Sequence, residues 1–122
     1  MAKWILVVDD ERDITTSLKT FLENNGYIVS TACDGPDCLQ KLEKEKPDLI
    51  LMDFFMPTMS GRETVERIRA NPKTKDIPII FLTVAQFGER GMEIIKELKV
   101  ADYIQKPVNT DELLGRIKRV SP

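Results

Sequence analysis

The sequence predicts an α/β fold in which a parallel sheet is covered by helices on both faces. Two observations lead to this prediction. Five short apolar runs recur along the chain and are expected to form strands: Trp4–Val8, Tyr27–Val29, Leu49–Met52, Ile77–Leu82 and Tyr103–Ile104. A segment with apolar residues at helical spacing follows each run. Strict alternation of strands and helices is typical of parallel sheets with right-handed crossovers.

The first, third and fourth runs are continuous stretches of apolar residues without alternation. Such runs indicate strands that are buried on both faces, which is the environment of the central strands of a parallel sheet. The runs at Tyr27–Val29 and Tyr103–Ile104 are shorter. We expect the strands around these two runs to extend beyond their apolar residues.

Each helix is recognised by an apolar stripe. In chain order the stripes are Ile14, Leu18, Phe21 and Leu22; Leu39 and Leu42; Val65 and Ile68; Met92, Ile95 and Leu98; and Leu113, Leu114, Ile117 and Val120. Asn25-Gly26 is expected to end the first helix, Gly35-Pro36 to open the second and Asn71-Pro72 to end the third. We expect Thr110 to cap the fifth helix, with acidic residues following at its positive end.

Composition and charge restrict the class of protein. The 122 residues include 42% hydrophobic and 31% charged residues, which is typical of a globular domain with a substantial core. The 18 basic and 20 acidic residues give a net charge of -2, so we expect no direct nucleic acid binding. No apolar run is long enough to span a membrane, and no signal peptide precedes the first strand. We therefore expect a cytoplasmic protein without membrane contact, whose residues 1–122 form a single domain.

The chain contains two cysteines, Cys33 and Cys38, and no histidine. A disulfide framework is not expected in a domain of this size with a good core, so we expect two reduced, partly buried thiols. The lack of histidine excludes Ser-His-Asp and Cys-His nucleophilic catalysis. Two thiols without histidine are also too few for a zinc site.

Acidic residues stand at two of the expected strand ends. Asp9, Asp10 and Glu11 follow the first run, and Asp53 follows the third. Ligands of open parallel sheets bind beyond the carboxyl ends of the strands. If the first and third strands are neighbours, Asp9, Asp10 and Asp53 converge, and their mutual repulsion favours a divalent cation among them. Mg²⁺ suits this set because it binds through one or two carboxylates and keeps waters and phosphate oxygens as further ligands.

A hydroxyl and a cation follow the fourth and fifth runs. Thr83 comes directly after Ile77–Leu82, and Lys106 comes after Tyr103-Ile104-Gln105. Taken singly, Thr83 fits a helix cap and Lys106 a solvated lysine. At the same sheet edge as three acids, they are suited to hold phosphoryl oxygens through a hydrogen bond and a positive charge. The combination predicts phosphoryl transfer, in which positioning and charge neutralisation carry most of the catalysis.

These residues fall within motifs that resemble the receiver domains of bacterial-type response regulators. The motifs are Val7-Val8-Asp9-Asp10-Glu11, Asp53-Phe54-Phe55-Met56-Pro57 with Ser60-Gly61, Leu82-Thr83, and Asp102-Tyr103-Ile104-Gln105-Lys106-Pro107. The resemblance covers essentially the whole chain, from the first strand to the fifth helix. It implies one receiver domain with a flavodoxin-like (βα)5 three-layer sandwich, in which five parallel strands have the order 2-1-3-4-5.

The resemblance also implies an acceptor and a metal site. Asp53 would accept a phosphoryl group from a phosphohistidine on a histidine kinase or a histidine phosphotransfer protein. Asp10, Asp53 and the backbone carbonyl of Phe55 would bind Mg²⁺ directly, and Asp9 would hold it through water. The protein would be a signalling switch in a phosphorelay rather than an enzyme, since it would assist only its own phosphorylation and dephosphorylation.

A switching mechanism follows from the same resemblance. Lys106 and Thr83 would contact the phosphoryl group on Asp53, and the Lys106-Pro107 peptide bond would be cis. Movement of Thr83 toward the phosphoryl group would admit Tyr103 into the space that it leaves. The readout surface would comprise the fourth helix, the fifth strand and the fifth helix, and would face a downstream effector or an output domain. The resemblance also allows a homodimer on phosphorylation.

Several residues depart from the pattern of the family. Phe55, Val84 and Ala85 stand near Asp53 where many relatives carry smaller or polar residues. We expect these side chains to crowd the site and exclude water, giving a long-lived phosphoryl-aspartate. Lys99 replaces the glycine that relatives usually carry before the last strand, which leaves the turn geometry there open. Two glycines within Gln86–Gly91 predict a weakly protected start of the fourth helix.

Three alternatives fit the fold class. A pseudo-receiver would act as a docking module without phosphorylation, but Asp9, Asp10, Asp53, Thr83 and Lys106 together favour an active site. A small Mg²⁺-dependent phosphatase with an aspartate nucleophile would need a second acid two residues after it, where an apolar residue stands. A mononucleotide binder would need a phosphate-binding loop after the first strand, where acids stand instead. The chain fits both a stand-alone regulator and a fragment of a larger regulator or hybrid kinase.

Overall fold

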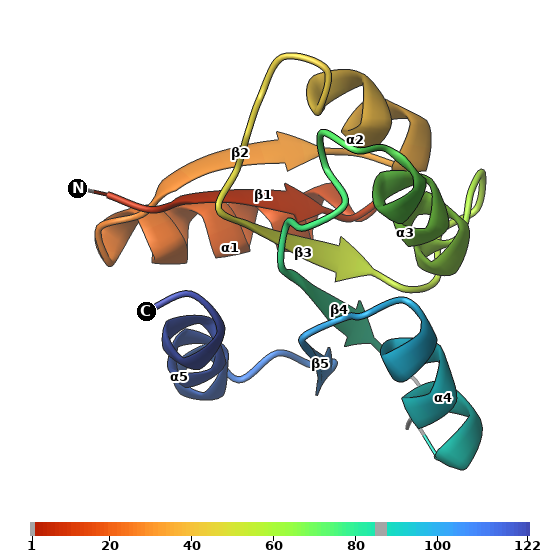
Figure 1. Ribbon diagram of the computed structural model, residues 1–122. Helices are drawn as coiled ribbons and strands as arrows, with labels where there is room; N and C mark the ends of the chain where they lie inside the picture. The colour runs from red at the N-terminus through yellow and green to blue at the C-terminus, as the bar shows by residue number, and fades with distance from the viewer. Residues whose placement is uncertain (1, 85–87) are drawn as a thin grey trace.

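The computed structural model describes residues 2–84 and 88–122. Five strands form one parallel sheet in the order β2-β1-β3-β4-β5, which confirms the implied fold (Figure 1). The strands are β1 (Trp4–Val8), β2 (Ile28–Ala32), β3 (Leu49–Asp53), β4 (Ile79–Thr83) and β5 (Asp102–Gln105). The helices are α1 (Arg12–Asn24), α2 (Gly35–Lys41), α3 (Gly61–Ala70), α4 (Glu89–Glu97) and α5 (Thr110–Val120).

The sheet separates two hydrophobic cores. On one face, α1 and α5 bury Leu18, Leu22, Leu113 and Ile117 against alternate strand residues. On the other face, α2, α3 and α4 bury Cys38, Leu42, Val65, Ile68, Ile94 and Ile95 (Figure 1). Because β1, β3 and β4 contribute side chains to both cores, their continuous apolar runs are explained by burial on two sides.

The sheet register brings the carboxyl ends of the central strands to one edge. Val8 pairs with Met52, Asp53 pairs with Leu82, and Thr83 pairs with Gln105. Asp53 and Thr83 are therefore the last residues of their strands rather than the first residues of the following loops. This register places the predicted site residues next to one another.

Four strands differ from the predicted bounds. β3 continues one residue to Asp53, and β5 extends by one residue at each end, to Asp102 and Gln105. β2 starts one residue later than expected and continues through Ser30 and Thr31 to Ala32. β2 lies at the edge of the sheet, where polar residues can face solvent. The apolar run therefore predicted a strand shorter than the one observed. β4 begins at Ile79 rather than Ile77, because Pro78 has no N–H to donate to the ladder.

Helix caps explain most of the helix boundaries. The Asp34 side chain accepts a hydrogen bond from Asp37 N–H at 2.8 Å, so α2 opens at Gly35 as predicted. The prediction that Thr110 caps α5 is wrong. Asn109 is the cap, and its side-chain oxygen accepts from Glu112 N–H at 3.0 Å, which leaves Thr110 as the first helical residue.

Two predictions of burial need correction. Met92 does not belong to the buried stripe of α4, because its side chain is 42% exposed. The stripe instead begins at Gly91, which has no side chain that an apolar pattern could reveal. Cys38 is fully buried and Cys33 is exposed, so the two free thiols have different environments rather than both being partly buried.

The turns after α1 and α4 both use the left-handed backbone region. Gly26 has a φ of 92°, which confirms that Asn25-Gly26 ends α1. Lys99 has a φ of 55° after α4. A lysine therefore adopts the conformation that a glycine provides without steric cost, which answers the question of the turn geometry.

The expectation for the start of the fourth helix falls on Gln86–Gly91, which includes positions outside the described residues; α4 is described from Glu89. Within the described ranges, no helix has both the length and the apolar character that crossing a bilayer requires.

Gly61 generates a prediction about the loop after β3. A Cβ atom at this position would lie 2.8 Å from Phe54 Cα and would also collide with the backbone oxygen of Asp53. We expect Gly61→Ala to lower the free energy of unfolding by about 1–3 kcal/mol, because backbone must move to make room. Urea denaturation measures this change.

Gly115→Ala is the matched control, because no atom lies within 4 Å of the corresponding Cβ position. Gly115 lies in α5, so this substitution should raise the stability by up to about 1 kcal/mol. Equal effects of the two substitutions would contradict the close approach at Gly61.

Candidate phosphorylation and metal site

Three carboxylates meet at the carboxyl edge of the sheet. Asp9 and Asp10 directly follow β1, and Asp53 ends β3. One carboxylate oxygen from each of these residues lies within 4.8 Å of the others. Asp9 and Asp53 are buried, while Asp10 is exposed. Since β1 and β3 are paired neighbours, the predicted convergence of the three acids is confirmed.

Backbone hydrogen bonds fix the loop that follows Asp53. Phe54 N–H donates to the Leu82 carbonyl at 2.8 Å, which continues the pairing of β3 with β4 past the acceptor. Gly61 N–H donates to the Phe54 carbonyl at 2.9 Å and closes the loop at the start of α3. The Phe54 ring packs edge-to-face on Phe81. The carboxylate of Asp53 therefore stands on a rigid strand end.

Lys106 brings a positive charge into contact with the acids of the site. Its side chain is only 8% exposed, and its Nζ donates to Asp9 Oδ2 at 2.8 Å. The same Nζ lies 3.5 Å from Asp53 Oδ1 and 3.7 Å from Glu11 Oε1. The peptide bond to Pro107 is cis, as the resemblance implied. Sequence reasoning placed Lys106 at the site but did not foresee Asp9 as its hydrogen-bond partner.

The charges of the site shift its ionisation equilibria. Burial, followed by repulsion from Asp9, raises the pKa of Asp53 to about 7, and Lys106 opposes this shift only in part. Burial alone would lower the pKa of Lys106. Its hydrogen bond and attraction to Asp9, with the further charges of Asp53 and Glu11, outweigh burial and raise that pKa. Lys106 therefore stays protonated, and the negative charge of the site is incompletely neutralised.

The two residues of the predicted switch lie on adjacent strands. Thr83 is fully buried at the end of β4, and its carbonyl accepts from Lys106 N–H at 2.7 Å. Tyr103 lies in β5 opposite Phe81, half-buried, and packs against the core beneath α2, α3 and α4. Arg116 in α5 donates to the Tyr103 carbonyl at 3.2 Å. The coupled movement of Thr83 and Tyr103 stays a prediction.

Phe55 follows Asp53 by two residues, and Val84 directly follows Thr83 at the end of β4. Phe55 is 53% exposed and Val84 is 64% exposed, although both are large apolar residues. The Phe55 N–H faces Asp53 Oδ1 at a long hydrogen-bond distance of 3.4 Å. Ala85, the third residue of the predicted crowding, is outside the described residues. The exclusion of water by these side chains stays a prediction.

The donor set fits a hard divalent cation. The site offers carboxylate oxygens, which are the ligands that Mg²⁺ prefers. Both oxygens of Asp9 already accept hydrogen bonds, Oδ1 from Glu11 N–H at 2.9 Å and Oδ2 from Lys106. Asp10 and Asp53 are thus better placed for direct coordination than Asp9. The water-mediated role that the resemblance implied for Asp9 stays a prediction.

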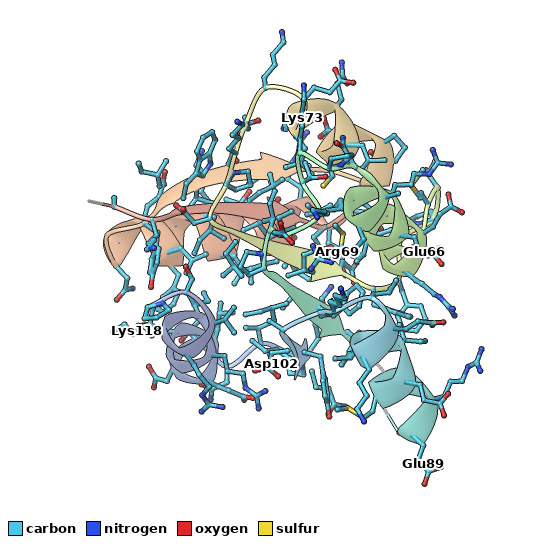
Figure 2. All side chains as sticks on the ribbon, viewed as in Figure 1. Glu66, Arg69, Lys73, Glu89, Asp102 and Lys118 are labelled. Atoms are coloured by element: carbon cyan, nitrogen blue, oxygen red, sulfur yellow. The ribbon has the colours of Figure 1, made fainter. Side chains whose placement is uncertain are left out.

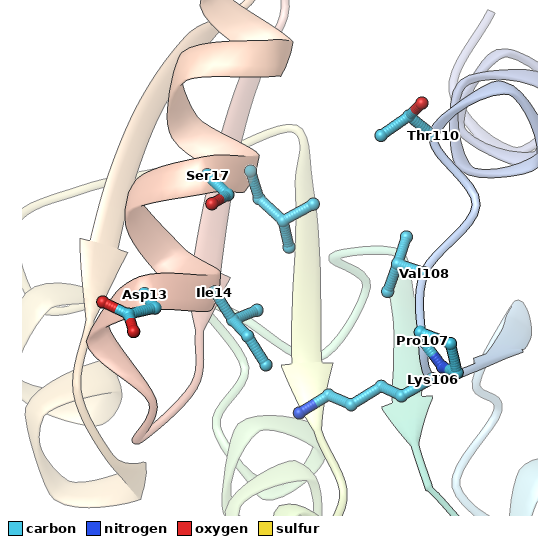
Figure 3. Close-up of a pocket in the computed structure, with 8 residues that line it drawn as sticks. Asp13, Ile14, Ser17, Lys106, Pro107, Val108 and Thr110 are labelled. Atoms are coloured by element: carbon cyan, nitrogen blue, oxygen red, sulfur yellow. The ribbon is translucent and has the colours of Figure 1, made fainter.

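A groove of about 310 Å³ borders the site along the stem of Lys106. Figure 3 shows Asp13 and Ile14 of α1 across from Pro107 and Val108, with Lys106 extending between the two segments. The lining is mostly apolar, which distinguishes it from the acidic site. Sequence reasoning missed this groove because its walls come from opposite ends of the chain.

Comparisons with known proteins agree with this geometry. A model of the response regulator receiver domain matches residues 5–118. The alkaline phosphatase synthesis transcriptional regulatory protein PhoP of Bacillus subtilis (strain 168) is 42% identical over 120 residues, which are 98% of this chain and 49% of that protein. The chain thus spans about half the length of this curated relative.

Solved structures give the same result. The chemotaxis protein CheY4 of Vibrio cholerae has a TM-score of 0.92 at 32% identity, with 98% of this chain and 99% of that chain covered. The N-terminal domain of a response regulator receiver protein from Methanoculleus marisnigri JR1 has a TM-score of 0.83 at 38% identity, with coverage of 98% and 97%. The chain therefore belongs to the family of response regulator receiver domains, the phosphorylation switches of two-component signalling.

Proposed function

We propose that Asp53 is the phospho-acceptor of this receiver domain and that Mg²⁺ assists its phosphorylation. The donor is a phosphohistidine on a histidine kinase or a histidine phosphotransfer protein. The observation that carries the proposal is the convergence of Asp9, Asp10 and Asp53 within 4.8 Å, with Lys106 among them. This arrangement supplies an ionisable nucleophile, cation ligands and a fixed positive charge in one place.

The residues divide the chemistry among them. An ionised oxygen of Asp53 attacks phosphorus while the bond from phosphorus to the imidazole nitrogen breaks, and the imidazole leaves neutral after taking a proton from solvent. Asp10, Asp53 and the Phe55 carbonyl would hold the cation directly, and Asp9 would hold it through water. Bound Mg²⁺ neutralises charge on the carboxylates and the phosphoryl oxygens. Lys106, which starts on Asp9, also pairs with a phosphoryl oxygen.

The output follows from Thr83 and Tyr103. Thr83 donates its hydroxyl hydrogen bond to the phosphoryl group on Asp53, and Tyr103 fills the space that Thr83 leaves. This movement changes the surface formed by α4, β5 and α5, which contacts a downstream effector or an output domain, or a second copy of the chain. Similarity to a transcriptional regulatory protein of about twice this length supports an output domain as the partner. The domain turns over no diffusible metabolite, so we class it as a cytoplasmic signalling protein rather than an enzyme.

Asp53→Asn tests the acceptor. Incubation of the wild-type protein with acetyl phosphate and Mg²⁺ should add one phosphoryl group, because an ionised Asp53 is the nucleophile. Asp53→Asn should add none, and intact-protein mass spectrometry measures the difference. Asp111→Asn, an exposed acid in the first turn of α5, should behave like the wild-type protein. A wild-type protein that takes up no phosphoryl group would instead support the pseudo-receiver.

The raised pKa of Asp53 predicts a pH-dependent affinity for Mg²⁺. A protonated carboxyl is a poor ligand, so protons compete with the cation below the pKa of about 7. The affinity should therefore rise about tenfold from pH 6 to pH 8, because the ionised fraction of Asp53 rises by about that factor. Titration calorimetry with Mg²⁺ measures the affinity. An affinity that does not change over this range would show that Asp53 is already ionised at pH 6.

Phe55→Asn tests the predicted crowding of the site. Replacement of an exposed aromatic ring by a smaller polar side chain should admit water and shorten the lifetime of the phosphoryl-aspartate. Decay of the phosphoryl group, followed by mass spectrometry after removal of the donor, measures this lifetime. Ile28→Asn is the control, since Ile28 is similarly exposed, at 55%, on the edge strand β2. An unchanged lifetime in Phe55→Asn would refute the crowding.

A further inference from the structure

Arg69, in the last turn of α3, joins two segments that lie far apart in the sequence. Its guanidinium donates to the carbonyls of Lys75 and Ile77, before β4, at 2.8 and 2.9 Å. It also donates to the carbonyls of Leu98 and Lys99, directly after α4, at 2.8 and 3.2 Å. Hydrogen bonds from a charged donor are stronger than those between neutral groups. Arg69 therefore ties the C-terminal end of α4 to α3 and to the segment that enters β4.

Other contacts hold the same end of α4. Glu97 Oε2 lies 3.5 Å from Arg62 Nη2, so a second arginine of α3 reaches the last turn of α4. Lys99 adopts its left-handed conformation here, and Val100 N–H donates back to the Ile95 carbonyl at 2.9 Å. The Val100 side chain is buried. The C-terminal end of α4 thus has fixed backbone, packed side chains and two arginine contacts.

The N-terminal end of α4 is held differently. Its cap residue is Gly88, which has no side chain to accept a hydrogen bond from the first turn. Glu89 and Arg90 are exposed, and within the described part of the chain neither forms an ion pair. Met92 is also exposed. Figure 2 shows Glu89 at the end of α4 far from Arg69.

The chain enters α4 on the side of the phosphorylation site. β4 ends at Thr83, and α4 is the next element along the chain. On the proposed function, a displacement of Thr83 would act on the N-terminal end of α4, because that end follows Thr83 along the chain, whereas the C-terminal end is bonded to α3. A rod that is fixed at one end and displaced at the other tilts about the fixed end. This asymmetry gives α4 a defined direction of movement.

We propose that Arg69 is the anchor about which α4 tilts when the site at Asp53 is loaded. The tilt rests on the proposed function, whereas the anchor itself exists in the free protein. Arg69 acts through backbone carbonyls and touches none of the reacting groups, so it is a positioning residue. Without the Arg69 guanidinium, the C-terminal end of α4 can move as well. The structural change that follows phosphorylation is then no longer confined to the N-terminal turns of α4.

Arg69→Met tests the anchor, because methionine keeps an unbranched stem but cannot donate to the four carbonyls. Arg67→Met is the matched control, since Arg67 is an exposed residue of the same helix with one ion pair to Glu63. Arg69→Lys keeps the charge with fewer donors and serves if Arg69→Met does not fold. Hydrogen exchange of α4 amides is measured in each protein, free and with Mg²⁺ and beryllofluoride.

In the free protein, Arg69→Met should accelerate exchange at the Leu98 and Val100 amides by about tenfold, while the Met92 amide stays within about twofold of the wild-type rate. These amides bond the Ile94, Ile95 and Gly88 carbonyls, so each reports one end of α4. Arg67→Met should match the wild-type protein. Unchanged rates at Leu98 and Val100 in Arg69→Met would overturn the anchor, whatever happens on loading.

When Mg²⁺ and beryllofluoride are added, the exchange rates of the wild-type protein should change over residues 89–93 and not over 97–100. In Arg69→Met, the change should extend to residues 97–100. Two results would overturn the proposed tilt of α4 about Arg69. One is a change in exchange rate of equal size at both ends of α4 in the wild-type protein, and the other is the same pattern of change in the wild-type protein and in Arg69→Met. Binding of beryllofluoride is followed separately by fluorine NMR. If none binds, the proposed function fails, and the comparison of the free proteins still decides the anchor.

Discussion

The structure depends on a buried excess of negative charge at the edge of the sheet. Asp9 and Asp53 are removed from water, and Asp10 adds a third carboxylate within reach. Buried carboxylates are costly unless they are paired, and Lys106 is the cation that pairs with them. Burial and then repulsion from Asp9 raise the pKa of Asp53, and Lys106 offsets this rise only in part. The same imbalance suits the site to a divalent cation and then to a phosphoryl group.

The fold maintains this imbalance by fixing each charge on a strand end. Asp9 and Asp53 are buried because β1 and β3 lie in the interior of the sheet. Lys106 follows the edge strand β5, and its side chain extends back to contact both acids. The close approach of Gly61 holds the loop after Asp53 in place. Arg69 lies in α3 and donates to the Leu98 carbonyl after α4 and to the Ile77 carbonyl before β4, so it joins these two segments. We therefore expect the surface helices, rather than the sheet, to respond to a change at the site.

The sequence allowed most of the fold to be predicted, because burial on two faces requires continuous apolar strands. It did not reveal the strand bounds at Pro78 or along the edge strand, which depend on hydrogen-bonding partners. It also misplaced the cap of α5 by one residue and could not show that Gly91 rather than Met92 faces the core. The role of Arg69 could not be predicted from the sequence, because a basic residue in the last turn of a helix usually only complements the helix dipole. The site acids were predictable because parallel strands bring their carboxyl ends together.

The central claim concerns the position of the phosphoryl group. The most direct measurement is to phosphorylate the protein with acetyl phosphate and Mg²⁺ and then reduce it with borohydride, which converts a phosphorylated aspartate into homoserine. Peptide mass spectrometry then locates the homoserine. We expect it at position 53 and nowhere else. Homoserine at Asp9 or Asp10 would contradict the assignment of Asp53 as acceptor. If no homoserine forms after incubation with excess acetyl phosphate and Mg²⁺, the protein is not phosphorylated on aspartate.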